Sequence, residues 1–186
     1  MDGKGFNQAS RKTTYGIVIV ALMTALAVIL SFIPGFPIIP AVSFIKYEYS
    51  DIPIIIAALA LGAPKGVLVA LLSVGVSLLL GQEGGGPWGA LQHFIAIGAN
   101  AFAAGLIYRF RKTKKGAVLA LSSGIILRTL LMIPANILII PLYTPASAEM
   151  VKGLLLPGVI PVNFLKGLIS AVVTFLVYKR VSRYLR

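Results

Sequence analysis

The chain has 186 residues, of which 58% are hydrophobic and only 12% are charged, and its mean hydropathy is +0.95. A composition this apolar excludes an ordinary water-soluble domain and predicts an integral membrane protein. The formal net charge is +12, but the basic residues occur in short clusters between apolar segments, which indicates membrane topology rather than a nucleic-acid-binding face. The absence of cysteine excludes disulfides and thiolate chemistry, and the single histidine excludes a multi-histidine metal site.

The first apolar segment, Tyr15 to Ile33, follows a lead that contains two lysines and one arginine. At about 20 residues it is longer than the hydrophobic part of a signal peptide, and no small-x-small cleavage site follows it. We therefore expect a retained transmembrane helix. The next connection, Pro34 to Ser50, alternates apolar and polar residues and favours a short strand or hairpin. This first external loop could close over a site as a lid or serve as an inert connector.

Five further apolar segments follow. Two of them, Asp51 to Leu61 and Gly66 to Leu80, are short for a membrane crossing, which takes about 20 residues. The turn signal Gly62-Ala63-Pro64-Lys65-Gly66 separates them. The other three are long enough to span: Trp88 to Tyr108, Ala117 to Ile140 and Pro157 to Tyr178. The sequence therefore predicts an all-α membrane protein with six transmembrane helices, in a single domain over residues 1–186.

The lysine and arginine residues between the predicted spans indicate the orientation. Three precede the first span, one lies in the Pro64 turn, five lie between Arg109 and Lys115 and four lie at the carboxyl terminus, which gives 13 on one side. The other side has two, Lys46 and Lys152. Because short cytoplasmic loops carry the excess of basic residues, both termini are expected to be cytoplasmic.

A lysine lies inside the last predicted span, where an ammonium costs a few kcal/mol on insertion scales and therefore usually faces a cavity or a partner. This residue is Lys166, and Asn163, three residues earlier, shares its helix face. In the preceding span Asn136 lies about 9 Å from the external end, and Lys166 lies about 12 Å from its own external end. Two amides and an ammonium at matching depth predict a small-molecule site in an apolar pocket.

Each of these polar residues also has a plainer interpretation. Lys166 could snorkel to the headgroups, and Asn136 could bond carbonyls freed by Pro134. Arg128, near the middle of the same span as Asn136, is interpreted as a brace between helices. His93 lies near the external start of its span and is expected to form interfacial hydrogen bonds, with a ligand contact as the alternative.

Other classes of function find little support in the sequence. Glu48, Asp51 and Glu83 form no close acidic motif, and His93 has no evident serine or carboxylate partner, which argues against a small membrane enzyme. The phosphate-loop pattern G-x-x-x-x-G-K-[ST] is absent, so the chain is not expected to hydrolyse ATP by itself. No ring-forming selectivity sequence indicates a channel.

Three motifs resemble those of the riboflavin-specific S components of energy-coupling factor (ECF) vitamin transporters. They are Lys46-Tyr47-Glu48-Tyr49-Ser50-Asp51-Ile52-Pro53, Asn136 with Pro141-Leu142-Tyr143, and Pro161-Val162-Asn163-Phe164-Leu165-Lys166-Gly167. The resemblance extends from the first span to the last. The sequence departs from the pattern at Gln92-His93-Phe94, where an asparagine is expected before the phenylalanine.

The resemblance implies a multi-pass subunit of the cell membrane that binds riboflavin from the external face. It also implies docking on a transmembrane coupling protein that two cytoplasmic ATPases drive. The coupling-protein contact falls on Ala21 and Ala25, a small-xxx-small pair that permits close helix contact. The flavin contacts of the family fall on Asn136, Asn163 and Lys166. Two further candidates for substrate binding are Tyr47, from the first motif, and His93.

The chemistry of a flavin agrees with these residues. Its pyrimidine edge alternates carbonyl acceptors with an imide donor, which amides and an ammonium can meet. Riboflavin is expected as cargo, with no metal, no cofactor and no nucleic acid partner. Two alternatives stay open: an S component for a different vitamin, and, from a different class, a small integral-membrane enzyme.

Overall fold

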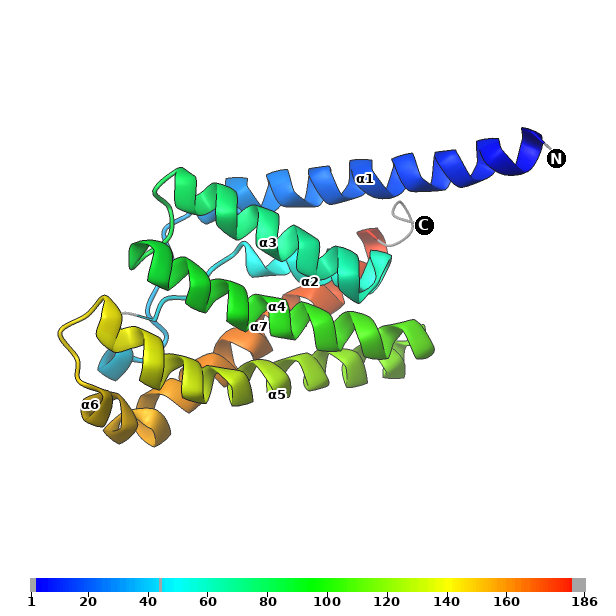
Figure 1. Ribbon diagram of the computed structural model, residues 1–186. Helices are drawn as coiled ribbons and strands as arrows, with labels where there is room; N and C mark the ends of the chain where they lie inside the picture. The colour runs from blue at the N-terminus through cyan, green and yellow to red at the C-terminus, as the bar shows by residue number, and fades with distance from the viewer. Residues whose placement is uncertain (1–2, 44, 182–186) are drawn as a thin grey trace.

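The structure, a computed structural model, describes residues 3–43 and 45–181 and is dominated by helices (Figure 1). Three short elements join the helices: the 3-10 turns η1 (Pro40–Val42) and η2 (Ile140–Leu142) and the π-helical turn η3 (Leu155–Val159). The described ranges contain no β-strand. The α-helices are α1 (Gly3–Ser31), α2 (Asp51–Leu61), α3 (Ala63–Leu79), α4 (Gly86–Phe110), α5 (Lys114–Ile139), α6 (Ala148–Gly153) and α7 (Ile160–Val181).

All six apolar segments that the sequence singled out are helical. Four helical segments are long and apolar enough to cross a membrane: Thr13–Ser31, Gly86–Phe110, Lys114–Leu142 and Leu155–Tyr178. The helices α2 and α3 have 11 and 17 residues, which at 1.5 Å per residue gives about 16 and 26 Å against a hydrocarbon core of about 30 Å. The short helix α6 was not predicted, because six residues are too few for a periodic pattern.

The short helix α2 is the centre of the bundle. It packs against α1, α3, α4 and α7 (Figure 1). Ile54, Ile55 and Ala57 on successive sides of the helix are 0% exposed, which explains why this segment is apolar all round instead of amphipathic. Its first residue, Asp51, is also 0% exposed. A carboxylate in the first turn is favoured by the helix dipole but needs further partners when buried.

Glycines allow the helices to approach closely where α2 turns into α3. Gly62 holds the turn with a φ of +91°, which L side chains rarely adopt. A Cβ atom on Gly105 of α4 would lie 2.6 Å from the backbone nitrogen of Ala63. The backbone of α4 therefore lies directly against the α2–α3 turn, and only glycine fits at residue 105.

The first external loop contains less regular structure than the sequence pattern favoured. A single antiparallel bridge joins Pro37 to Lys46, and the N–H group of Tyr47 donates to the carbonyl oxygen of Phe36 at 2.9 Å. Between them the chain forms the turn η1 instead of extending the pairing. Proline cannot donate a ladder hydrogen bond, and this loop contains three, so a longer hairpin does not form.

Candidate functional site

A small polar cavity lies at the end of the bundle where α4 begins, α5 ends and α7 begins. Its volume is about 60 Å³, which holds only a few water molecules, whereas pockets for drug-sized ligands measure about 300 to 1,000 Å³. The first external loop contributes Ile45, Lys46 and Glu48 to its wall. A ring system therefore fits only when the walls move apart, and the parts of the wall that lie outside the long helices are this loop, Gly84 and Tyr143.

Four of the five predicted binding residues line this one cavity: His93, Asn136, Asn163 and Lys166. They come from α4, α5 and α7. The prediction that Asn136 and Lys166 lie at matching depth is therefore confirmed. All four side chains are buried, with residue exposures of 8% or less.

Tyr47 is placed elsewhere. It does not line the cavity, and its side chain is buried against other aromatic rings, with its ring centroid 5.2 Å from that of Tyr49 in an edge-on arrangement. Its hydroxyl accepts a hydrogen bond from Ser170 Oγ of α7 at 3.2 Å, and burial raises the pKa of this hydroxyl. These contacts tie the first external loop to α7.

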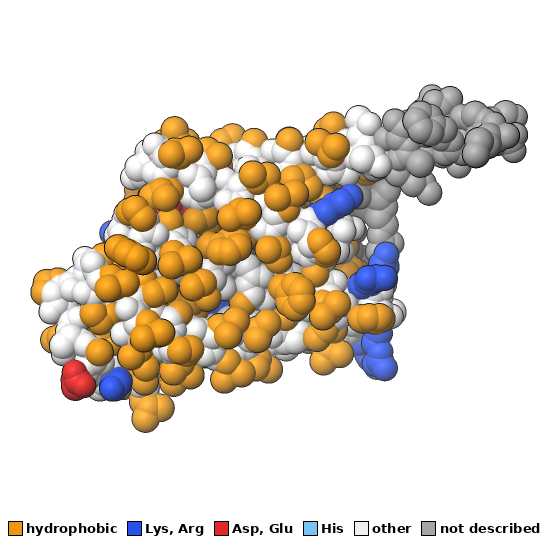
Figure 2. All heavy atoms as spheres, viewed as in Figure 1, with side chains coloured by type: hydrophobic (Ala, Val, Ile, Leu, Met, Phe, Trp, Pro, Cys, Tyr) orange, Lys and Arg blue, Asp and Glu red, His pale blue; other side chains and the backbone are white. Residues whose placement is uncertain are grey.

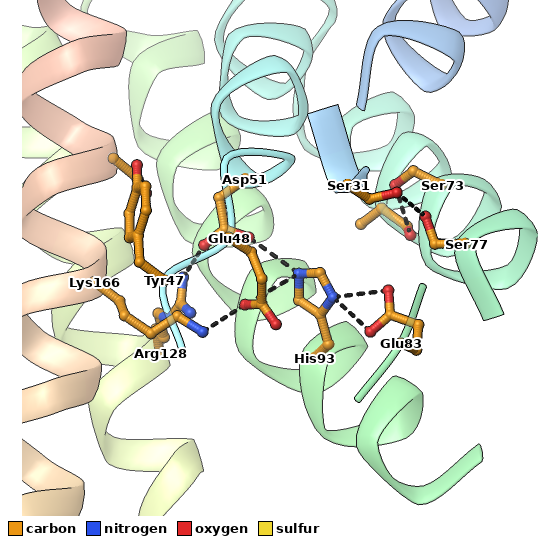
Figure 3. Close-up of polar contacts among 12 residues, drawn as sticks. Ser31, Tyr47, Glu48, Asp51, Ser73, Ser77, Glu83, His93, Arg128 and Lys166 are labelled. Atoms are coloured by element: carbon orange, nitrogen blue, oxygen red, sulfur yellow. Dashed lines mark hydrogen bonds and ion pairs between the residues drawn. The ribbon is translucent and has the colours of Figure 1, made fainter. Parts of the chain in front are cut away.

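His93 is the centre of a cluster of charged side chains (Figure 3). Its Nδ1 lies 3.1 Å from both carboxylate oxygens of Glu83, and its Nε2 lies 3.1 Å from Asp51 Oδ1. A neutral imidazole has only one N–H group, whereas both ring nitrogens here face carboxylates. The geometry therefore fits the doubly protonated imidazolium.

Two further cations enter the cluster from α5 and α7. Arg128 Nη1 donates to Asp51 Oδ2 at 2.6 Å, and both side chains are 0% exposed. This contact agrees with the interpretation of Arg128 as a brace, since it joins α5 to α2. Lys166 Nζ donates to Glu48 Oε2 at 2.5 Å. The snorkelling interpretation of Lys166 is therefore wrong, because the ammonium pairs with a carboxylate at the cavity.

The cluster balances three carboxylates against three cations when His93 is protonated. Glu48 is its most accessible member, with a side chain that is 34% exposed. Burial alone would raise the pKa of Glu48, but the nearby charges of His93 and Lys166 outweigh it and leave the pKa below its usual value. Glu48 is therefore an anion at neutral pH. Balanced pairing explains how a membrane protein holds this many charges among its helices.

The amides extend the polar wall in a chain of hydrogen bonds. Tyr143 Oη donates to Gln92 Oε1 at 2.6 Å, and Gln92 Nε2 donates to Asn136 Oδ1 at 2.8 Å. Asn136 Nδ2 donates to the carbonyl of Met132 at 2.5 Å. Pro134 lacks an N–H group and therefore leaves free the carbonyl of the residue four positions earlier, Leu130. The interpretation that Asn136 bonds a carbonyl freed by Pro134 is therefore wrong, because Asn136 bonds Met132 instead. Asn163 Nδ2 donates in the same way to the carbonyl of Val159 at 2.9 Å.

The sequence argument about the acidic residues is corrected by these contacts. Glu48, Asp51 and Glu83 do converge, and His93 does have carboxylate partners. The four residues lie on separate segments, and their spacing along the chain carries no periodic signal. One signal was available: the chain has only five acidic residues, and Arg128 and Lys166 within the spans each require an anion.

Glu48, Glu83 and His93 each place one oxygen or nitrogen atom within 4.8 Å of the others, which is the spacing of a metal site. The carboxylate of Glu48, however, already accepts a hydrogen bond from the ammonium of Lys166 through Oε2. A divalent cation would have to displace this ammonium and the imidazolium proton, and it would meet the guanidinium of Arg128 nearby. The cluster is thus better described as a set of ion pairs.

Comparison with known proteins identifies the family. The family model described as "ECF transporter, substrate-specific component" matches residues 16–178. The chain belongs to this family. A component of this kind is part of a transporter and is not in itself an enzyme, and with its long apolar helices it is a membrane protein.

Similar individual proteins agree with the family. The riboflavin transporter RibU of Streptococcus thermophilus is 32% identical over 93% of this chain and 83% of its own length. The riboflavin transporter FmnP of Bacillus subtilis is 29% identical over 91% of this chain and 93% of its own length. A solved structure described as the S component of a bacterial ECF transporter superimposes with a TM-score of 0.77 at 26% identity, covering 94% of this chain and 99% of that one.

Proposed function

We propose that this S component binds riboflavin and delivers it for import. The observation that carries the proposal is the convergence of Asn136, Asn163 and Lys166 on one cavity. The names of the relatives from Streptococcus thermophilus and Bacillus subtilis support the choice of cargo. Each asparagine uses one amide hydrogen on the backbone carbonyl four residues earlier and retains a second N–H for a flavin carbonyl.

Two cations of the cluster have N–H groups left for a ligand. The ammonium of Lys166 has three N–H groups and uses one on Glu48 of the first external loop, so it can donate another to a flavin carbonyl. Arg128 lines the same cavity, and its Nε and Nη2 are buried without a hydrogen-bond partner. Unpaired buried donors are costly. A ligand acceptor, or water, at this depth would satisfy them, so Arg128 has a role in binding as well as in bracing.

The orientation follows from the charge asymmetry of the loops. We infer six membrane-embedded helices, both termini in the cytoplasm and the cavity open to the outside of the cell membrane. The whole chain then acts as one binding unit, and a transmembrane coupling protein with two cytoplasmic ATPases supplies the energy. Ala21 and Ala25 lie on the exposed face of α1, and Ala21 also lines a hollow between α1 and α3. A partner helix could approach closely at this face.

The absorption spectrum of the purified protein and a titration of riboflavin fluorescence test the cargo. We expect copurifying flavin absorbance and tight, saturable quenching. The double variant Lys166→Ala/Asn163→Ala should weaken riboflavin binding by about two decades or more. Each change leaves a polar group of the flavin without its hydrogen-bond partner, at a cost of roughly 1 to 3 kcal/mol. Lys152→Ala, a cation outside the cavity, is the matched control. Unchanged riboflavin affinity in the double variant would exclude this site. Copurification of a different vitamin would show that the cargo is that vitamin and not riboflavin.

A further inference from the structure

The end of the molecule opposite the cavity carries basic residues without anions of their own. The connection from Arg109 to Lys115 contains five lysines and arginines. Among the side chains that the structure describes, those of residues 13–43, 45–178 and 180, salt bridges involve only cations at or near the other end. Figure 2 shows blue side chains gathered at the end where α4 meets α5. Their counter-anions must come from outside the described part of the chain.

Two of these basic residues, Lys112 and Lys114, line a hollow of about 320 Å³. Its other walls include Tyr108 on α4 and Phe175 and Leu176 on α7. Both lysines are exposed, so their ammonium groups can reach a ligand at the mouth of the hollow. The hollow is therefore basic at its outer edge and apolar within.

An apolar groove of about 240 Å³ continues from this hollow between α5 and α7. Phe175 and Leu176 line both, so the hollow and the groove adjoin, and we call the two together the path. Leu121 and Ala171, which are 4% and 7% exposed, also line the groove. Val118, 53% exposed, is on its accessible side. This apolar surface is open to the surrounding lipid.

The length of the path matches one leaflet of a bilayer. It runs along α5 from Lys114 to Ile125, which is about 16 Å at 1.5 Å per residue. Half of the hydrocarbon core is about 15 Å. The helices α5 and α7 come into direct contact at the inner end of the path, where a Cβ atom on Gly167 would lie 3.1 Å from Ile125 Cγ1.

We propose that this path holds one anionic phospholipid, with its phosphate at Lys112 and Lys114 and one acyl chain along Leu121 and Ala171. Basic pockets at the ends of transmembrane helices favour anionic lipid headgroups. Inorganic phosphate would meet the lysines but leave the apolar groove empty, and a neutral lipid would fill the groove but leave the lysines unpaired. Only an anionic lipid satisfies both parts. The site is independent of the riboflavin site at the other end.

Native mass spectrometry of the detergent-solubilised full chain, titrated with dioleoyl-phosphatidylglycerol or dioleoyl-phosphatidylcholine, tests this site. We expect one retained phosphatidylglycerol, bound roughly tenfold more tightly than phosphatidylcholine. The double variant Lys112→Gln/Lys114→Gln should lose this preference. Arg111→Gln/Lys115→Gln removes the same charge from the same connection outside the hollow and should keep it.

A second variant tests the groove. Ser122→Phe places a ring in it from an exposed position and should weaken binding of both lipids at least tenfold, with circular dichroism and monodisperse elution as checks of folding. Equal losses in the two charge variants would indicate a general surface effect and overturn the site. So would equal binding of the two lipids, full competition by inorganic phosphate, or a dimer of the chain in place of a lipid adduct.

Discussion

At the scale of single residues, this protein buries opposite charges in pairs among its helices. Arg128 and Asp51 have no exposed surface, and His93 contacts carboxylates through both ring nitrogens. Removing one partner of a buried pair leaves an uncompensated charge, which is more costly than replacing both partners by apolar groups. Lys166 therefore cannot be treated as a lone intramembrane charge, and its deletion is not expected to stabilise the empty protein.

Two variants of the ion pair between Lys166 and Glu48 separate stability from binding. Lys166→Ala should lower the melting temperature of the ligand-free protein, since Glu48 loses its cation, at a cost of about 1 to 3 kcal/mol. Combining Glu48→Gln with Lys166→Met should recover most of this stability without recovering riboflavin affinity. Thermal melts without ligand and riboflavin titrations measure the two effects. A double variant as unstable as Lys166→Ala would show that the unpaired carboxylate of Glu48 is not the cause of the loss.

At the scale of elements, Gly105 allows α4 to lie directly against the turn between α2 and α3. Gly105→Ala should destabilise the protein, because its Cβ atom would lie 2.6 Å from the backbone nitrogen of Ala63 and α4 would have to move. Gly75→Ala on α3 is the control, since nothing lies within 4 Å of a Cβ atom there; it should be neutral or stabilise by up to about 1 kcal/mol through helix propensity. Melting temperatures of the two variants compare the effects. Equal shifts in melting temperature would mean that α4 moves away from Ala63 without a cost in stability.

The first helix is expected to affect transport without affecting capture. Replacing Ala21 and Ala25 with leucine adds bulk to the exposed face of α1, far from the cavity, and should abolish uptake while riboflavin affinity stays nearly unchanged. Cellular uptake and copurification with the coupling protein provide the measurement. Leu22→Phe with Leu26→Phe adds bulk at other exposed positions of α1 and should be tolerated. Normal uptake in the Ala21/Ala25 variant would mean that the partner contact lies elsewhere.

At the scale of the whole molecule, the charges divide the bundle into a basic end and an end that carries the cavity. The chain contains no cysteine, so single introduced cysteines report topology without background. A cysteine at residue 82, in the α3–α4 connection, should react with an impermeant maleimide in intact cells. A cysteine at residue 112 should react only after the membrane is permeabilised. Reaction of both positions in intact cells would contradict the six-helix topology.

The sequence predicted the helices because apolar segments of this length leave few other solutions in a bilayer, where backbone groups must bond within their own segment. It also predicted that Asn136 and Lys166 meet, because depth along two antiparallel helices follows from residue counts. It did not predict the convergence of Glu83 and Asp51 on His93, since contacts among loop and helix-end residues depend on how the elements pack.

The sequence by itself therefore determined that this is a helical membrane protein, where its long spans lie, and that the last two spans share a polar patch. These conclusions depend on local quantities: hydropathy, helix rise and the cost of intramembrane charge. Only the tertiary structure decided that Tyr47 packs against Tyr49 and contacts Ser170, that Lys166 is ion-paired, and that α2 is the centre of the bundle. Burial and pairing are properties of neighbours in space, and for these residues the neighbours come from distant parts of the chain.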